Sequence, residues 1–207
     1  MICLAAWGCS QDEGKSTGAA RPLPPGGTIV AFGDSLTEGY GLDETDAWPS
    51  LLHDRLRKEG KTYQVINAGV SGETSQGALS RVEWILKMKP DIVILETGAN
   101  DGMRGIDPRL TRENIDKIVV KLQASGAKVV LAGMRMLVSL GAAFTRSFEA
   151  IYPDIAKNRQ LILIPFILEV VAGVRNLNLS DGIHPNAEGH RLMMETVYPY
   201  VIQAIGG

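Results

Sequence analysis

One serine, one aspartate and one histidine in this chain have the types and positions that nucleophilic chemistry needs. Ser35 follows the apolar run Thr28–Phe32, which reads as a buried β-strand. Asp181 and His184 lie close together near the other end of the chain. A serine hydroxyl becomes a nucleophile when an imidazole accepts its proton and a carboxylate orients that imidazole. Ser35, His184 and Asp181 are therefore candidates for nucleophile, base and orienting acid.

Apolar strands and amphipathic helices alternate from Thr28 to the end of the chain. We expect strands at Thr28–Phe32, Tyr63–Ala68, Asp91–Glu96, Ala127–Ala132 and Leu161–Ile164. We expect helices at about Ala47–Glu59 with Asp46 as N-cap, Thr74–Lys89, Thr111 to a stop at Gly126, Ala142–Asn158 and Asn186–Ile205. This alternation predicts an α/β fold, a three-layer α/β/α sandwich around a five-stranded parallel sheet. Residues 28–207 then form a single domain.

Parallel strands bring the candidate residues to one edge of this sheet, because their carboxyl ends lie together. Ser35 follows the first strand, and the loop Gly69–Thr74 follows the second and leads into a helix, where free backbone N–H groups favour an anion. Asn100 follows the third strand and offers a side-chain amide. Gly69 and Gly72 both permit unusual backbone angles, and spacing alone does not separate them. The edge therefore combines a nucleophile, a base and donors for an oxyanion, as acyl transfer requires.

Composition excludes several other classes of function. Charged residues make up 21% of the chain and the formal net charge is −2, so there is no basic excess for nucleic acid. Both cysteines, Cys3 and Cys9, lie in the first ten residues, which argues against a thiol nucleophile, a disulfide or a cysteine-ligated metal in the folded part. Two further histidines, His53 and His190, fall on expected helices and are interpreted as structural or solvent-facing.

Residues 1–27 are interpreted as a leader and flexible linker. An apolar run, Met1–Gly8, is too short to span a bilayer, and a proline- and glycine-rich linker ends the segment. The run resembles the end of a bacterial lipoprotein export signal, with Cys9 as the residue that would be lipidated. This predicts a periplasmic protein or a membrane-anchored lipoprotein. Bulky Trp7 and the lack of a preceding basic residue keep open a leader without function and a cytoplasmic protein.

Four sequence blocks carry a resemblance to a known family. They are Gly33–Leu36, Asn67–Gly72, Gly98–Asp101 and Asp181–Pro185. In order and spacing the chain resembles the SGNH/GDSL hydrolases, in particular their bacterial arylesterase, thioesterase I and lysophospholipase L1 branch. The resemblance covers about Thr28 to Ile205 and implies the flavodoxin-like SGNH hydrolase fold.

The resemblance also assigns roles. It implies Ser35 as nucleophile, His184 as general base and then acid, and Asp181 as the residue that orients His184. It implies an oxyanion hole made by the backbone N–H groups of Ser35 and Gly72 and the side-chain amide of Asn100. The reaction would be hydrolysis of short- to medium-chain carboxylic esters through an acyl-serine, with aryl esters, thioesters and lysophospholipids as substrate classes. No metal or cofactor is expected, and the partner would be a small ester or lipid.

Other functions remain open. The same site could transfer the acyl group to an alcohol or deacetylate a carbohydrate, and a catalytically silent binding domain is the non-enzyme alternative. A phosphoacceptor role for Asp34 in a receiver-like domain would need an acidic cluster and a lysine that the chain does not place correctly. The segment Met134–Gly141 replaces the proline-asparagine-tyrosine-glycine type loop usual in the branch, so we expect an acyl pocket of different shape. Nothing in the sequence predicts the oligomeric state.

Overall fold

The computed structural model describes residues 26–136 and 140–206. Most of the predicted leader, including Cys9, lies outside these ranges, so its interpretation stays a prediction. No helix within them is long and apolar enough to cross a membrane.

The predicted strands form one parallel sheet, which confirms the α/β/α architecture. The strands are β1 (Thr28–Gly33), β2 (Gln64–Gly69), β3 (Ile92–Glu96), β4 (Lys128–Ala132) and β5 (Ile162–Ile164). Their spatial order is β2-β1-β3-β4-β5, the flavodoxin-like order. Strand β1 lies between β2 and β3, and it is in register with β2 at Phe32–Ala68 and with β3 at Phe32–Leu95. The chain therefore leaves β1 next to the ends of both neighbours.

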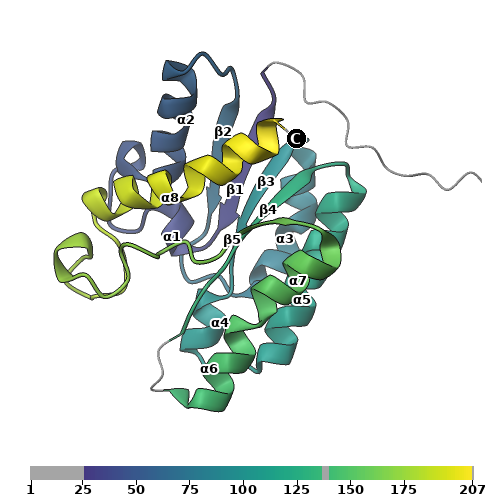
Figure 1. Cartoon of the computed structure of the whole chain (residues 1–207), viewed down its shortest axis with the longest axis vertical. Coiled ribbons are helices and arrows are strands. Elements are labelled where there is room, and N and C mark those ends of the chain that lie inside the picture. Colours follow the sequence, from purple (N-terminus) through teal and green to yellow (C-terminus); the bar gives the residue numbers. More distant parts are fainter. Residues whose placement is uncertain (1–25, 137–139, 207) are drawn as a thin grey trace, which may run out of the picture.

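Helices cover both faces of the sheet, as Figure 1 shows. They are α1 (Ser35–Glu38), α2 (Trp48–Lys58), α3 (Ser75–Lys87), α4 (Ala99–Met103), α5 (Pro108–Ala124), α6 (Ala142–Glu149), α7 (Ile151–Arg159) and α8 (Ala187–Gly206). On one face α2 packs against α8, and on the other α5 packs against α3 and α7. The core between these layers consists largely of aliphatic side chains on the strands, which are buried almost throughout β1, β3 and β4.

Two helix predictions are wrong in their bounds. The helix expected at Thr111 begins at Pro108, where the Asp107 side chain accepts the backbone N–H of Arg109 at 2.9 Å. The helix expected at Ala142–Asn158 is two helices, α6 and α7, which meet at Ala150. Pro153 lies three residues after that junction and has no N–H for the carbonyl of residue 149, so the hydrogen-bond ladder is broken there.

Helix α2 begins without the expected cap. We predicted Asp46 as N-cap, but Asp46 belongs to a short 3₁₀ turn, Glu44–Asp46, and the cap position is Ala47, which has no side-chain cap bond. The backbone N–H of Trp48 instead donates to Nδ1 of His190, 3.1 Å away on α8. A contact distant in the sequence thus replaces the local cap.

Candidate active site

The nucleophile candidate, Ser35, lies where β1 ends, as the first residue of α1. Asp34 caps this short helix, because its side chain accepts the backbone N–H of Leu36 at 3.0 Å. Ser35 is 7% exposed, so it is at the surface of the core but still reachable. The turn brings the serine to the carboxyl edge of the sheet, where parallel α/β folds bind ligands.

The structure brings Asp181, His184 and Ser35 into one hydrogen-bonded line. Nε2 of His184 lies 3.0 Å from Oγ of Ser35, and Nδ1 lies 2.7 Å from Oδ2 of Asp181. The other oxygen of Asp181 accepts the backbone N–H groups of Ile183 at 2.8 Å and His184 at 3.0 Å. With Asp181 ionised, Nδ1–H of His184 donates to it, and Nε2 is left to accept the serine proton.

Electrostatics favour this arrangement of protons. The hydrogen bond from His184, with the two backbone donors, lowers the pKa of Asp181 to about 2. Asp181 is therefore ionised across the neutral range. On its outer side the His184 ring packs against the ring of Tyr40, with centroids 4.4 Å apart and planes tilted by 35°. Sequence analysis did not assign a role to Tyr40.

The loop after β2 distinguishes the two glycines that spacing alone did not separate. The backbone N–H of Gly69 already donates to the Asn67 side chain at 3.0 Å. Gly72 has a φ of +76°, and in the described part of the chain its N–H has no acceptor, while its carbonyl accepts the Arg104 guanidinium at 2.9 Å. The free N–H of Gly72 is thus the one that can bind an anion.

The third donor candidate, Asn100, is buried in α4 beside Ser35. Its Nδ2 donates one hydrogen to Oδ2 of Asp34 at 3.1 Å, which leaves the second hydrogen of the same amide for another acceptor. Asp101, the next residue, accepts the backbone N–H of Ser75 at 2.7 Å and the hydroxyl of Thr111 at 3.1 Å. These contacts fasten α4 to the start of α3, and hence Asn100 to the loop that carries Gly72.

A buried acidic residue below the nucleophile was missed by sequence analysis. Glu96, at the end of β3, is fully buried, and its Oε2 accepts the backbone N–H of Asp34 at 3.1 Å and the hydroxyl of Thr37 at 2.9 Å. Burial raises the pKa of Asp34 to about 6, and it raises that of Glu96 well above its ordinary range. The available signal was a single acidic residue at the end of an otherwise apolar strand.

An apolar cavity opens on one side of Ser35. Its volume is about 340 Å³, within the usual range for small-molecule sites. Its walls are formed by the nucleophile turn, α4, the start of the segment after β4 and the loops after β5. The apolar residues that line it include Leu36, Ala99, Met103, Met134, Met136, Phe166, Leu168 and Ile183. Methionine side chains are flexible and polarisable, so these walls can adapt to ligands of different shape.

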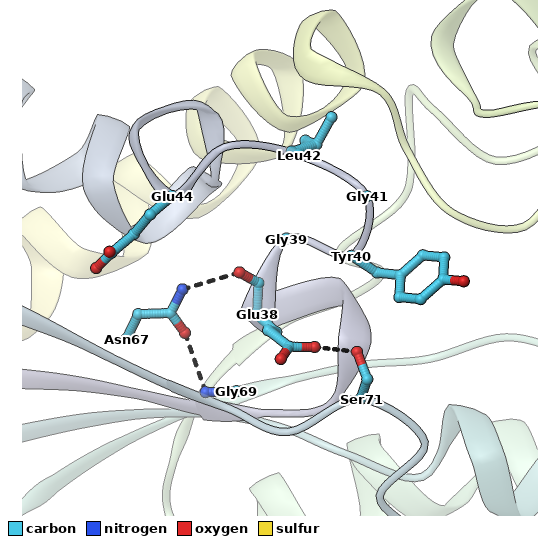
Figure 2. A pocket seen from close by; sticks show the side chains of 9 residues that line it. All are labelled: Glu38, Gly39, Tyr40, Gly41, Leu42, Glu44, Asn67, Gly69 and Ser71. Carbon is cyan, nitrogen blue, oxygen red and sulfur yellow. Dashed lines mark hydrogen bonds between the residues drawn. The ribbon is translucent and has the colours of Figure 1, made fainter.

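A second, polar cavity of about 580 Å³ lies beyond the Ser71 side of the site. Figure 2 shows that the Asn67 side chain donates to the backbone carbonyl of Glu38 and accepts the backbone N–H of Gly69. The Ser71 hydroxyl donates to the Glu38 carboxylate. Tyr40 lies at the opposite end from Glu44. The two carboxylates give this cavity an acidic character.

The remaining histidines have structural contacts. His190 is buried, accepts the Trp48 N–H, and has its pKa lowered to about 4 by burial. Nδ1 of His53 accepts the backbone N–H of Val65 at 3.3 Å. Residues 26–136 and 140–206 contain no group of three or more histidine, cysteine, aspartate or glutamate side chains arranged to hold a metal ion.

Comparison with known proteins gives consistent matches. The model of the GDSL-like lipase/acylhydrolase family matches residues 31–192. Esterase TesA of Pseudomonas aeruginosa is 38% identical over 173 residues, covering 83% of this chain and 86% of that protein. Thioesterase 1/protease 1/lysophospholipase L1 of Escherichia coli strain K12 is 38% identical over 162 residues, covering 78% and 76%. The crystal structure of the Pseudoalteromonas esterase EstA, inhibited by monoethylphosphonate, has a TM-score of 0.83 at 31% identity and covers 87% of this chain and all (100%) of that one.

Proposed function

Because this chain belongs to the GDSL-like lipase/acylhydrolase family, we propose that it is a serine esterase that hydrolyses carboxylic esters through an acyl-serine. The observation that carries the proposal is the hydrogen-bonded line from Asp181 through His184 to Ser35. Its relatives named esterase and thioesterase support the same reaction class.

In the proposed reaction Oγ of Ser35 attacks the ester carbonyl carbon while Nε2 of His184 takes its proton. Asp181 keeps Nδ1 protonated and stabilises the imidazolium that results. The negative charge on the carbonyl oxygen is met by the backbone N–H groups of Ser35 and Gly72 and by Nδ2 of Asn100. His184 then gives its proton to the departing alcohol, and a water activated by the same imidazole releases the acid from Ser35.

We assign the acyl group to the apolar cavity beside Ser35, because most of its lining side chains are apolar. The leaving alcohol then departs past Tyr40 and Ser71, towards the polar cavity. The cavity volume of about 340 Å³ favours short- to medium-chain acyl groups. A thioester or a lysophospholipid fits the same scheme, since only the leaving group differs.

The test is hydrolysis of p-nitrophenyl esters by the wild-type protein and by Ser35→Ala. We expect Ser35→Ala to lose at least about 10³-fold in kcat, because a triad enzyme that lacks its nucleophile retains only a small residual rate compared with the intact enzyme. A matched control is Ser80→Ala, an exposed serine on α3. Equal hydrolysis by the wild-type protein and Ser35→Ala would refute the assignment of the nucleophile.

The substrate class needs a panel of acyl chains from two to sixteen carbons, with acyl thioesters alongside. We expect kcat/KM to peak in the short to medium range. The residues that replace the family's usual loop include Met134 and Met136, which line the cavity, so the profile should differ from that of a relative that keeps the loop. An identical profile would contradict a pocket of different shape.

We propose export to the periplasm from the sequence of the leader, with lipidation of Cys9 as its finer form. Both concern residues outside the described ranges. Mass spectrometry of the mature protein from a bacterial membrane fraction tests them: a diacylglyceryl-modified Cys9 at the N-terminus would support anchoring, whereas an intact Met1 in a cytosolic fraction would contradict export.

A further inference from the structure

Glu96 joins the strand β3 to the turn that carries the nucleophile. Its Oε2 accepts two hydrogen bonds from that turn, one from the backbone of Asp34 and one from the side chain of Thr37. Its other oxygen, Oε1, is buried and has no donor among the described residues. A buried carboxylate oxygen without a donor is strongly destabilising, so this atom calls for an explanation.

A proton on Oε1 supplies one. It converts the oxygen into a donor, and we assign the carboxyl group of Asp34, whose backbone N–H already donates to Glu96, as its acceptor. Burial and the charge of Asp34 raise the pKa of Glu96 well above its ordinary range, whereas the hydrogen bonds that Asp34 accepts limit the rise of its own pKa. At neutral pH the pair therefore holds one proton, on Glu96, and Asp34 is ionised.

The charge of Asp34 decides how Asn100 is oriented. An ionised carboxylate can only accept hydrogen bonds, and Asp34 accepts the N–H of Leu36 and Nδ2 of Asn100. The amide of Asn100 must then turn its NH₂ group towards Asp34, and the second hydrogen of that group remains available. A protonated Asp34 could donate instead, and the amide could turn its carbonyl oxygen to it.

We propose that Glu96 is a positioning residue for ester hydrolysis, which holds its own proton, keeps Asp34 ionised, and so fixes Asn100 with an N–H directed to the oxyanion. The inference rests on the proposed function of the site. The surrounding fit is tight: a Cβ on Gly33 would lie 2.2 Å from Oγ1 of Thr37 and 2.5 Å from Oε2 of Glu96. The turn can therefore shift very little to compensate for a lost contact.

Other titratable groups face this pair from three sides. Asp101 on α4 is engaged by Ser75 and Thr111, and Tyr152 on α7 donates its hydroxyl to the carbonyl of Thr97 at 2.9 Å. His184 faces Asp34 from the loop before α8 and, when protonated, lowers the pKa of Asp34. Burial and the nearby carboxyl groups raise the pKa of Tyr152 well above its ordinary range, so its phenol stays neutral.

Three variants test the proposal on p-nitrophenyl butyrate. Glu96→Leu removes both the proton held for Asp34 and the oxygen that accepts from Asp34 and Thr37. We expect kcat to fall about 10²-fold with KM nearly unchanged, because the oxyanion donor Asn100 loses its orientation. Glu96→Gln keeps an N–H for Asp34 and an oxygen for Thr37, so kcat should stay within about threefold of wild type. Thr97→Val is the matched control: the Thr97 hydroxyl is also buried without a partner among the described residues, and kcat should not change. Thermal unfolding confirms that each variant is folded.

The pH profile separates positioning from simple packing. When Glu96 ionises at alkaline pH it loses the proton that it donates to Asp34, and the two carboxylates repel each other. Asp34 and the Asn100 amide bound to it then lose their fixed position, so wild-type kcat should fall there, whereas Glu96→Gln should keep its activity. Loss of kcat in Glu96→Gln as large as in Glu96→Leu, full kcat in Glu96→Leu, or a change confined to KM would overturn the proposal.

An infrared measurement gives a readout that does not depend on ester hydrolysis. The difference spectrum between wild type and Glu96→Gln at neutral pH should contain the carbonyl band of a protonated carboxylic acid. Absence of that band would overturn the proposal even if Ser35-dependent hydrolysis is found. If the band is present but wild type and Ser35→Ala hydrolyse esters equally, the proposed function fails and the link from Glu96 to the oxyanion falls with it, while the proton on Glu96 stands.

Discussion

Two aspartates lie on the two sides of Ser35, and their surroundings act on them in opposite ways. Asp181 is in a surface loop, and a hydrogen bond from His184 lowers its pKa to about 2. Asp34, the residue before Ser35, is 1% exposed, and burial raises its pKa to about 6. The exposed carboxylate is kept ionised by its own loop and by water, whereas the buried one depends on a residue of the neighbouring strand, Glu96. The exposed side of the site is thus organised locally, and the buried side through the sheet.

Among the variants that compare the two sides of Ser35, the largest effect should come from Asp181→Asn on the exposed side. An amide can donate to Nδ1 of His184 and so favour the tautomer whose proton on Nε2 faces Ser35, where an acceptor is needed. We expect kcat for p-nitrophenyl butyrate to fall about 10³- to 10⁴-fold at neutral pH. The control is Asp43→Asn, another exposed loop aspartate. A loss of less than about tenfold in Asp181→Asn would show that His184 is not oriented through Asp181.

The next largest effect concerns the buried side of Ser35 and tests whether Glu96 and Asn100 are coupled. Asn100→Ala should lower kcat about 10²- to 10³-fold, since one oxyanion donor is lost. If Glu96 acts through Asn100, the double variant Glu96→Leu/Asn100→Ala should be no slower than Asn100→Ala alone. Asp181→Asn/Asn100→Ala should instead be close to the product of the two single losses. Multiplicative losses in both pairs would show that Glu96 and Asn100 act independently.

A third prediction uses the pH dependence of stability. The contributions of Asp34 and Asp181 to the free energy of unfolding change in opposite directions as pH increases. The pKa of Asp34 rises from 3.8 to about 6 on folding, so between about pH 4 and pH 6 the folded state holds more protons than the unfolded state. The free energy of unfolding should therefore fall by about 3 kcal/mol as pH increases through that window. Asp181, with its lowered pKa, stabilises the fold above about pH 4, and this contribution is lost as pH falls towards 2.

Urea unfolding at a series of pH values measures both contributions. Asp34→Asn should flatten the wild-type slope between about pH 4 and pH 6, because the residue that titrates there is removed. Asp181→Asn should leave that slope unchanged and reduce the loss of stability below about pH 4. An unchanged slope in Asp34→Asn would mean that the buried aspartate does not carry the raised pKa.

Most of the fold followed from the sequence because apolar strands and amphipathic helices have distinct periods. One error arose where a contact distant in the sequence replaced a local signal, at Trp48, whose N–H is bound by His190. The helices α1 and α4 were also not predicted, since four or five residues are too few to show a period. The break at Ala150 had a local signal in Pro153, which lies inside an otherwise helical pattern.

The exposed and the buried side of the candidate site also differ in how far they could be predicted from the sequence. Asp181, His184 and Ser35 could be named from residue types, and their proximity followed from the shared edge of a parallel sheet. The role of Glu96 could not be predicted, because it depends on the register that places the end of β3 beside the nucleophile turn. Spacing alone did not separate Gly69 from Gly72; the family resemblance favoured Gly72, and the structure adds a physical reason, since the N–H of Gly69 is engaged by Asn67.

The smallest effect should come from Tyr40, whose ring packs on His184 with centroids 4.4 Å apart. The hydrogen bond from Nδ1 of His184 to Asp181 already orients the imidazole, and the backbone N–H of His184 fixes the same carboxylate, so the Tyr40 ring adds only one packing contact to the exposed side. An aromatic contact of this kind contributes about 0.5–1.5 kcal/mol, and Tyr40→Leu should reduce kcat about two- to tenfold. Tyr40→Phe keeps the ring and should match wild type on p-nitrophenyl butyrate. A loss in Tyr40→Leu as large as in Asp181→Asn would mean that the exposed side also depends on a residue from a distant segment, and the contrast between the two sides of Ser35 would no longer hold.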